Sequence, residues 1–194
     1  MKKIIVVVFF VLTAGCNSMA NSESLDSRAE SGDAVSQFAL GMAYYDGSDG
    51  HTKNDELSIY WLKKAANQNY SIAMRIVGMR YLRGISVNQD YGEAERWLEK
   101  AANKGEEIAQ LNLGFMFEGS YEQVLVDYKR AAYWLTKAAN QGNSFAAARV
   151  AEMYRDGLGV RQNNSIAKEW FGKLCDIGDQ AGCDEYAKIN SLRY

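Results

Sequence analysis

Four tryptophans recur through the chain at almost equal intervals. Trp61, Trp97, Trp134 and Trp170 are separated by 36, 37 and 36 residues. A fixed period of this length indicates stacked supersecondary units, because one unit of that size cannot bury its own apolar face. The spacing therefore predicts a repeat architecture rather than one globular core.

Upstream of each tryptophan, the same period places a small residue followed three positions later by an aromatic one. These pairs are Gly41 and Tyr44, Gly78 and Tyr81, Gly114 and Phe117, and Ala151 and Tyr154. A small residue allows two helices to approach closely, and the aromatic ring fills the space beside them. A glycine turn follows at Gly47, Gly84 and Gly157, whereas Gly119 comes one place early in the third copy. We therefore expect the third loop to differ from the others.

Each tryptophan also lies in a segment with signals for the start and the end of a helix. Residues suited to capping the helix N-terminus precede it, namely Asn54, Asp90, Asp127 and Asn163. Residues that tolerate a left-handed backbone end it, namely Asn69, Gly105, Gly142 and Gly178. Each unit thus consists of a helix, a turn, a capped helix and a stop. Four such units predict an all-α solenoid of antiparallel helix pairs.

This pattern resembles the Sel1-like repeat family, which is related to the tetratricopeptide repeats. The third unit carries it as Ala109, Leu113-Gly114, Phe117, Asp127, Ala131, Trp134, Lys137-Ala138-Ala139 and Gly142. The resemblance covers about residues 33 to 188 and implies a surface that binds a protein partner. Its phase predicts repeats at 33–69, 70–105, 106–142 and 143–178, followed by a C-terminal capping half-repeat at 179–194.

The first residues are typical of a secretory signal peptide. Lys2 and Lys3 precede an uncharged apolar run at 4–12, which is too short to span a membrane. Cys16 follows Ala-Gly and resembles the lipidated cysteine of a bacterial lipobox, although Thr13 stands where that pattern usually has leucine. The resemblance implies a signal peptide at 1–15 and a lipoprotein facing the periplasm. Asn17, which is not aspartate, favours the outer membrane; an ordinary cleaved signal is the alternative.

The segment after Cys16 is rich in Ser, Asn and Glu and has no apolar period, so we expect a flexible tether over 16–32. Removal of residues 1–15 takes away Lys2 and Lys3, which changes the net charge from −2 to −4. Nucleic-acid binding needs clustered Lys and Arg, and the mildly acidic balance argues against it.

Two cysteines replace packing alanines in the last unit. Cys175 stands at the position of Ala139, and Cys183 at the position of Ala146. These alanines face each other between consecutive repeats, so the two thiols should be neighbours. The resemblance to the cysteine-rich branch of the family implies a disulfide, which an oxidising periplasm permits. It would clamp the capping half-repeat; a pair of free buried thiols is the alternative.

The sequence offers little for catalysis or for a cofactor. His51 is the single histidine, which leaves no zinc or iron constellation. The acidic turn at 46–50 has Leu57 where a calcium loop needs glutamate. Ser165 and Lys168 match the Ser-x-x-Lys pattern of penicillin-recognising enzymes, but no Lys-Thr-Gly follows. We therefore predict a non-enzymatic chain without cofactor or metal, with a β-lactam-directed hydrolase as a distant alternative.

If the first helix of each pair lines the concave face, the positions that packing does not fix are candidates for partner binding. They are Met42, Met79, Arg80, Arg83, Phe115, Met116, Arg149, Glu152 and Asp156. Met, aromatic and Arg residues anchor many interfaces, but the Met and Phe residues fit a repeat-to-repeat core equally well. The loop at 121–126 is a further candidate, although burial under the neighbouring repeat is the favoured explanation.

These observations predict a monomeric, lipid-anchored interaction module that acts as an adaptor or scaffold in the bacterial envelope. Sel1-like lipoproteins also occur among proteins that neutralise secreted antibacterial toxins such as phospholipases. The resemblance therefore implies an immunity protein as the alternative.

Overall fold

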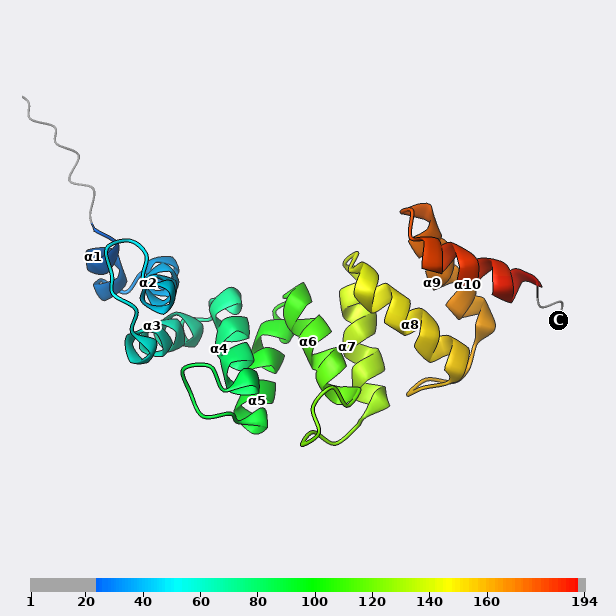
Figure 1. The fold of residues 1–194 in the computed structure, drawn as a ribbon, viewed down its shortest axis with the longest axis horizontal. Coiled ribbons are helices and arrows are strands. Elements are labelled where there is room, and N and C mark those ends of the chain that lie inside the picture. Colours follow the sequence, from blue (N-terminus) through cyan, green and yellow to red (C-terminus); the bar gives the residue numbers. More distant parts are fainter. Residues whose placement is uncertain (1–23, 192–194) are drawn as a thin grey trace, which may run out of the picture.

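The computed structural model describes residues 24–191, which form ten helices and no strand in an elongated array (Figure 1). The predictions of a signal peptide and of lipidation at Cys16 lie outside the described residues. The helices are Leu25–Glu30 (α1), Ala34–Asp46 (α2), Asp55–Asn67 (α3), Ser71–Arg83 (α4), Tyr91–Asn103 (α5), Glu107–Phe117 (α6), Tyr128–Asn140 (α7), Ser144–Asp156 (α8), Asn164–Asp176 (α9) and Gln180–Ser191 (α10).

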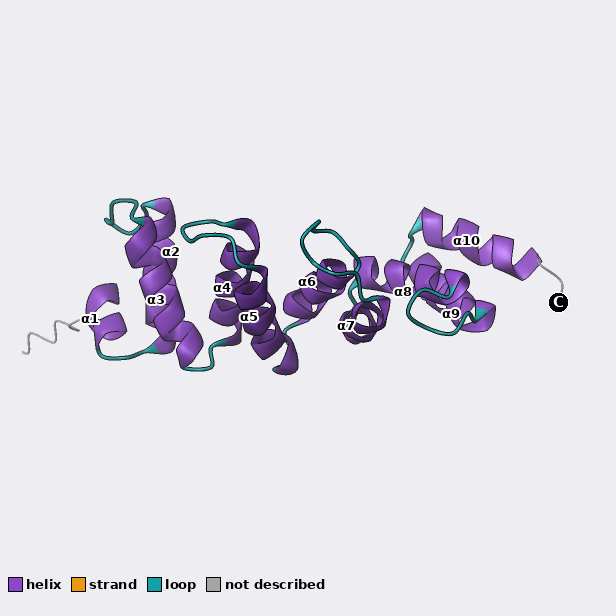
Figure 2. Ribbon diagram, turned by 90° about the horizontal axis from the view of Figure 1, so that it is seen from below, coloured by secondary structure: helices purple, strands orange, loops and turns teal. Residues whose placement is uncertain are grey.

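The helices pack in the order of the chain, as expected for a solenoid. The main contacts join consecutive helices, and the pairs α2–α3, α4–α5, α6–α7 and α8–α9 form repeats 1 to 4 (Figure 2). Within residues 24–191, no helix combines the length and the hydrophobicity that a membrane span requires. The predicted all-α solenoid is therefore confirmed.

Helix boundaries follow the capping and turn residues. At the starts of α3, α5, α7 and α9, a capping side chain accepts a hydrogen bond from a backbone N–H group of the first turn. The capping residues are Asn54, Asp90, Asp127 and Asn163. The first helices α2, α4 and α8 end at glycines with a left-handed backbone. In repeat 3, α6 has 11 residues instead of 13 and ends at Glu118, so its loop differs as expected.

The glycine of each first helix sets the distance to the second helix. A Cβ atom on Gly78 would lie 2.8 Å from Leu98 Cγ, and one on Gly114 would lie 2.4 Å from Leu135 Cγ. Both leucines are fully buried, so neither can move away without a loss of packing. The predicted close approach of the helices at these glycines is confirmed.

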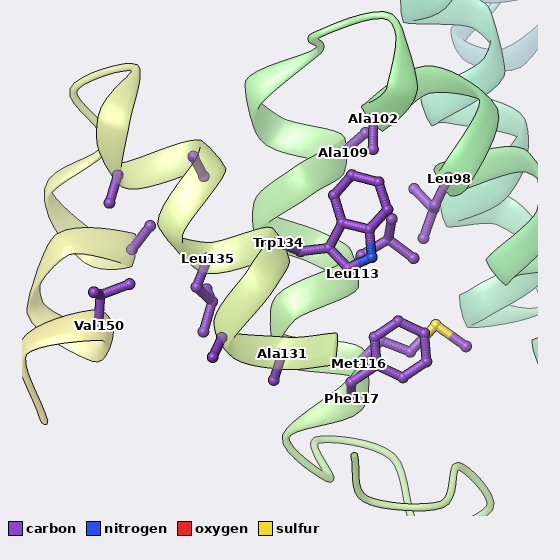
Figure 3. Close-up of a cluster of buried hydrophobic side chains, with 14 of the residues drawn as sticks. Leu98, Ala102, Ala109, Leu113, Met116, Phe117, Ala131, Trp134, Leu135 and Val150 are labelled. Carbon is purple, nitrogen blue, oxygen red and sulfur yellow. The ribbon is translucent and has the colours of Figure 1, made fainter. Parts of the chain in front are cut away.

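The tryptophans belong to the core, and a lysine lies over each ring. Trp61, Trp134 and Trp170 are buried, and Trp97 packs against the cluster that contains Trp134 and Trp170. Figure 3 shows Trp134 directed toward Ala102 and Ala109. The lysine three residues later has its Nζ 4.4 Å from the Trp97 ring and 4.0 Å from the Trp170 ring. The lysine three residues after each tryptophan therefore covers the ring through a cation–π contact.

The N-terminal end corrects the predicted tether at 16–32. Residues 25–30 form α1, which starts at the cap Ser24 and buries Ala29 completely. Gln37 Nε2 donates a hydrogen bond of 3.0 Å to the Ala29 carbonyl, and His51 Nε2 lies 3.0 Å from Asp26 Oδ1. This short helix folds because it covers the otherwise open end of repeat 1.

At the other end, α10 packs against α9 as a capping helix. A disulfide joins Cys175 to Cys183, with their Cα atoms 4.4 Å apart. Arg155 of α8 adds an ion pair to Glu185 of α10 at 3.1 Å. The disulfide implied by the family resemblance is thus present, and it clamps the last helix onto the array.

Candidate partner-binding site

An open pocket of about 150 Å³ lies between the first helices of repeats 1 and 2. Its lining is mostly apolar and includes four of the residues predicted to bind a partner. The lining residues are Met42, Tyr45, Ile76, Met79, Arg80, Arg83 and Ile85. We call this site the α2–α4 pocket.

Arg80 forms the floor of the α2–α4 pocket and is only 4% exposed. It was predicted as a surface residue, and that part of the prediction is wrong. Its guanidinium carbon lies 4.4 Å from the centre of the Tyr45 ring, and its Nη1 donates a hydrogen bond of 3.3 Å to Ser86 Oγ. Within residues 24–191, no carboxylate forms an ion pair with it. The pocket therefore contains a buried cation that no carboxylate of the described residues contacts as an ion pair, although Asp55 is close enough to act on its charge.

The surroundings of Arg80 act on its pKa in two directions. Burial lowers the pKa of the guanidinium, and the neighbouring Tyr45 phenol and Asp55 carboxylate oppose this effect. An arginine remains protonated in proteins despite such a shift, so the side chain stays cationic.

The rim of the α2–α4 pocket joins apolar side chains to a second cation. Met42 and Met79 are half-buried: they pack against the core and also line the pocket. They therefore serve the packing between repeats and remain accessible to a partner. Arg83 is exposed at the end of α4. The pocket thus offers apolar contact below a positively charged edge.

The remaining candidates lie in repeats 3 and 4. Met116 is 1% exposed and belongs to the core, so its predicted contact with a partner is wrong. Phe115 is half-buried and packs against the same core. These positions face the repeat interface because Met116 lies two residues after the closely packed Gly114.

Each charged candidate of repeat 4 forms an ion pair with a neighbouring side chain. Arg149 Nε lies 2.9 Å from Glu118 Oε1, and Glu152 forms a second ion pair with the same guanidinium. Asp156 pairs with Arg155 at 2.8 Å. The structure therefore divides the predicted surface into an open pocket in repeats 1 and 2 and a closed set of ion pairs in repeat 4.

The third loop does not behave as expected. Leu125 is 91% exposed and Val126 is 52% exposed, so burial under the neighbouring repeat is wrong for these two residues. Tyr121 does contact the neighbouring repeat, since its ring centre lies 5.8 Å from that of Tyr91. The Asp127 N–H donates to the Phe117 carbonyl at 2.8 Å and closes the loop, which leaves its tip outside the packing layer.

Sequence reasoning missed a row of exposed apolar residues along the edge where the first helices begin. The second residue of each first helix is apolar and at least 36% exposed. The row consists of Val35, Ile72, Ile108 and Phe145. Their spacing repeats the tryptophan period, which was a usable signal, but an apolar residue in a helix is ordinarily assigned to the core.

The alternative catalytic pattern is not assembled. Ser165 is exposed, and Lys168 Nζ donates to Asn190 Oδ1 at 2.5 Å. In the described part of the chain, no hydrogen bond joins Ser165 to Lys168, as activation of a serine by a neighbouring base would require. Among residues 24–191, no group of three or more His, Cys, Asp and Glu side chains could hold a metal ion.

The architecture and the periodic packing define an α-solenoid repeat protein. The Sel1 repeat matches residues 34–70, 71–106, 108–143 and 144–179, so the chain belongs to the Sel1 repeat family. A solved Sel1 repeat protein from Oxalobacter formigenes is 30% identical and superposes with a TM-score of 0.73. The match covers 85% of this chain and 47% of that one.

Two eukaryotic relatives share shorter segments. The ERAD-associated E3 ubiquitin-protein ligase component HRD3B of Arabidopsis thaliana is 29% identical over 94 residues, which are 48% of this chain and 14% of that protein. The chitin synthase regulator SKT5 of Saccharomyces cerevisiae is 33% identical over 92 residues, which are 46% of this chain and 13% of that protein. The chain thus corresponds to a small part of each of these relatives.

Proposed function

We propose that this chain is a protein-interaction module that docks a partner on the concave face lined by its first helices, with the α2–α4 pocket as the main contact. The observation that carries this proposal is the union, in one open pocket, of Met42, Met79 and the cations Arg80 and Arg83. Apolar side chains next to arginine are typical anchors of protein interfaces. The names of the two eukaryotic relatives, a ligase component and a synthase regulator, support a role exercised through another protein.

Site-specific photo-crosslinking in the intact cell envelope tests this proposal. A photoreactive residue at position 83, on the rim of the α2–α4 pocket, should give a crosslinked partner band. The matched control is position 133, because Tyr133 is 52% exposed on the second helix α7. A band from position 133 together with none from position 83 would place the partner on another face and overturn the proposal.

The identity of the crosslinked partner decides between two roles. An envelope component would specify the adaptor or scaffold, which is our proposal. A secreted toxin encoded beside this chain would specify the immunity role instead.

We further propose that the module is a lipoprotein of the bacterial envelope that faces the periplasm and is anchored through Cys16 in the outer membrane. The support comes from the signal-like residues 1–15 and from the Cys175–Cys183 disulfide, which fits an oxidising compartment. Labelled palmitate should be incorporated into the wild-type chain and not into Cys16→Ala. Wild-type protein found unlabelled in the soluble periplasmic fraction would exclude the anchor.

A further inference from the structure

The repeat period shows that Arg80 occupies a core position. The equivalent residues of repeats 1, 3 and 4 are Ala43, Met116 and Met153, each 1% exposed. Repeat 2 therefore places a guanidinium where the scaffold normally has a small or apolar side chain. Burial of a charge is unfavourable unless a partner compensates it. A violation of the packing rule at a single repeat indicates a functional site.

The other partly buried arginines have carboxylate partners, whereas Arg80 does not. Arg75, on the same helix, lies 2.7 Å from Glu106, and Arg130 lies 2.5 Å from Glu95. A guanidinium has five N–H donors, and the Ser86 hydroxyl accepts only one hydrogen bond from Arg80. The Tyr45 ring covers one face of the guanidinium but does not neutralise its charge. The side chain is therefore prepared to bind an anion.

The position of Arg80 at the floor of the α2–α4 pocket defines the kind of anion. The walls are apolar, and a space of about 150 Å³ accepts a group about the size of benzene. Arg83 adds a second positive charge at the entrance. A carboxylate next to an apolar side chain matches this arrangement in charge and in size.

We propose that the α2–α4 pocket binds a partner segment in which an Asp or Glu side chain pairs with Arg80 while a neighbouring Leu, Met or Phe side chain packs between Met42 and Met79. This inference rests on the proposed docking function and adds the chemistry of the partner. A carboxylate that enters the pocket meets a cation that burial has already stripped of most of its water and that lies against the Tyr45 ring. Recognition is therefore sensitive to the loss of either charge.

A peptide array tests the inference directly. The probes are acetylated and amidated nonapeptides of Gly and Ser with one Asp or Glu at varied distances from one Leu, Met or Phe. Each acidic peptide has a neutral twin with Asn or Gln. Wild-type protein should bind a subset of the acidic peptides at least about tenfold more tightly than their twins.

The decisive variant is Arg80→Met, because methionine is the natural residue at this position in repeats 3 and 4. It should fold, as its circular dichroism will show, and it should bind the acidic peptides at least about tenfold more weakly. The matched control is Arg75→Met, which removes a paired arginine of the same helix outside the pocket and should leave peptide binding unchanged. Absence of binding to every acidic peptide, equal binding of the neutral twins or full binding by folded Arg80→Met would each overturn the inference.

A second measurement separates this inference from the docking function. Met79→Glu should abolish partner crosslinking from position 83 by placing a charge on the apolar wall. If Met79→Glu abolishes the crosslink and Arg80→Met retains it, the docking function stands and the carboxylate inference is wrong. If both variants retain the crosslink, the pocket is not the docking site and both proposals fail.

Discussion

The two halves of the solenoid use the same scaffold positions in opposite ways. Met42, Met79 and Phe115 occupy one equivalent position in repeats 1 to 3, and Glu152 replaces them in repeat 4. Likewise, Ile76 corresponds to Arg149. The apolar wall of the N-terminal half thus becomes an ion pair in the C-terminal half.

The ends of the array show the same division. The N-terminal end is capped by the short helix α1 through hydrogen bonds and the contact of His51 with Asp26. The C-terminal end is clamped by the Cys175–Cys183 disulfide. In the C-terminal half, the charged side chains form ion pairs and a disulfide holds the last helix. In the N-terminal half, the buried Arg80 has no ion-pair partner among residues 24–191. The residues that all repeats share are therefore sufficient for stacking. The ability to bind a partner depends on the side chains that differ between repeats and lack a partner within the described part of the chain.

The strongest test of this comparison moves the buried arginine into another repeat. Met116→Arg places a guanidinium at the position equivalent to Arg80, but Leu82 stands where Tyr45 would be. Without an aromatic partner, the free energy of unfolding should fall by about 3–5 kcal/mol, as for an uncompensated buried charge. Urea denaturation followed by circular dichroism measures the change.

The reciprocal variant Arg80→Met serves as the control and should unfold at an equal or higher urea concentration than the wild type. A loss below about 1 kcal/mol in Met116→Arg would show that any repeat tolerates the cation. The surroundings of Arg80 would then not differ from the equivalent position of repeat 3 in their ability to hold a buried guanidinium.

Removal of the covalent clamp tests the C-terminal end. The double change Cys175→Ala and Cys183→Ala restores the alanines found in the other repeats and removes a crosslink of sequence separation 8. Loss of so short a loop should lower the free energy of unfolding by about 2–3 kcal/mol in the chain-entropy account. A reductant should produce the same shift in the wild type and none in the double variant. An unchanged wild-type unfolding curve in reductant would show that the disulfide does not stabilise this end.

The ion pairs of the C-terminal half should differ according to burial. Glu118 is 7% exposed and both of its oxygens lie within 3.1 Å of Arg149 Nε, so Glu118→Gln should lower the free energy of unfolding by about 1–2 kcal/mol. Glu152 is 35% exposed and pairs with the same arginine, so Glu152→Gln should change it by about 0.5 kcal/mol or less. Equal losses in chemical denaturation would contradict this ranking.

The sequence predicted the features that depend on local chemistry. The caps at Asn54 and Asp90 and the close approach at Gly78 and Gly114 follow from residue type and period alone, and the structure confirms them. The disulfide followed from the family resemblance once its cysteines had been aligned with facing alanines. In each case, the repeat indicates which residues of neighbouring helices face each other.

Features in which residue type and repeat position disagree were harder to predict. Helix α1 has only six residues, and its composition resembles that of a tether, although Leu25 and Ala29 lie one period before Leu62 and Ala66. Arg80 was assigned to the surface as a position that packing does not fix, although its alignment with Ala43, Met116 and Met153 marks a core position. Leu125 was expected to be buried because it is apolar. These errors have one cause: residue polarity was given more weight than repeat position.

The last prediction concerns the cap at the N-terminal end and depends on pH. The hydrogen bond that His51 Nε2 donates to the Asp26 carboxylate raises the pKa of His51 in the folded chain, and burial opposes this effect. The unfolded value is about 6.5, so the contact contributes its full stabilisation below that pH and loses it as the pH rises through the higher folded pKa. Thermal unfolding from pH 5.5 to 8.5 should therefore show a wild-type advantage over Asp26→Asn that is largest at low pH and worth at most about 1 kcal/mol. Because His51 is the single histidine of the chain, a pH dependence of this sign should be absent from His51→Gln. An advantage over Asp26→Asn that stays constant across this range would show that the charge of His51 does not hold α1, and that packing of Ala29 alone caps the N-terminal end.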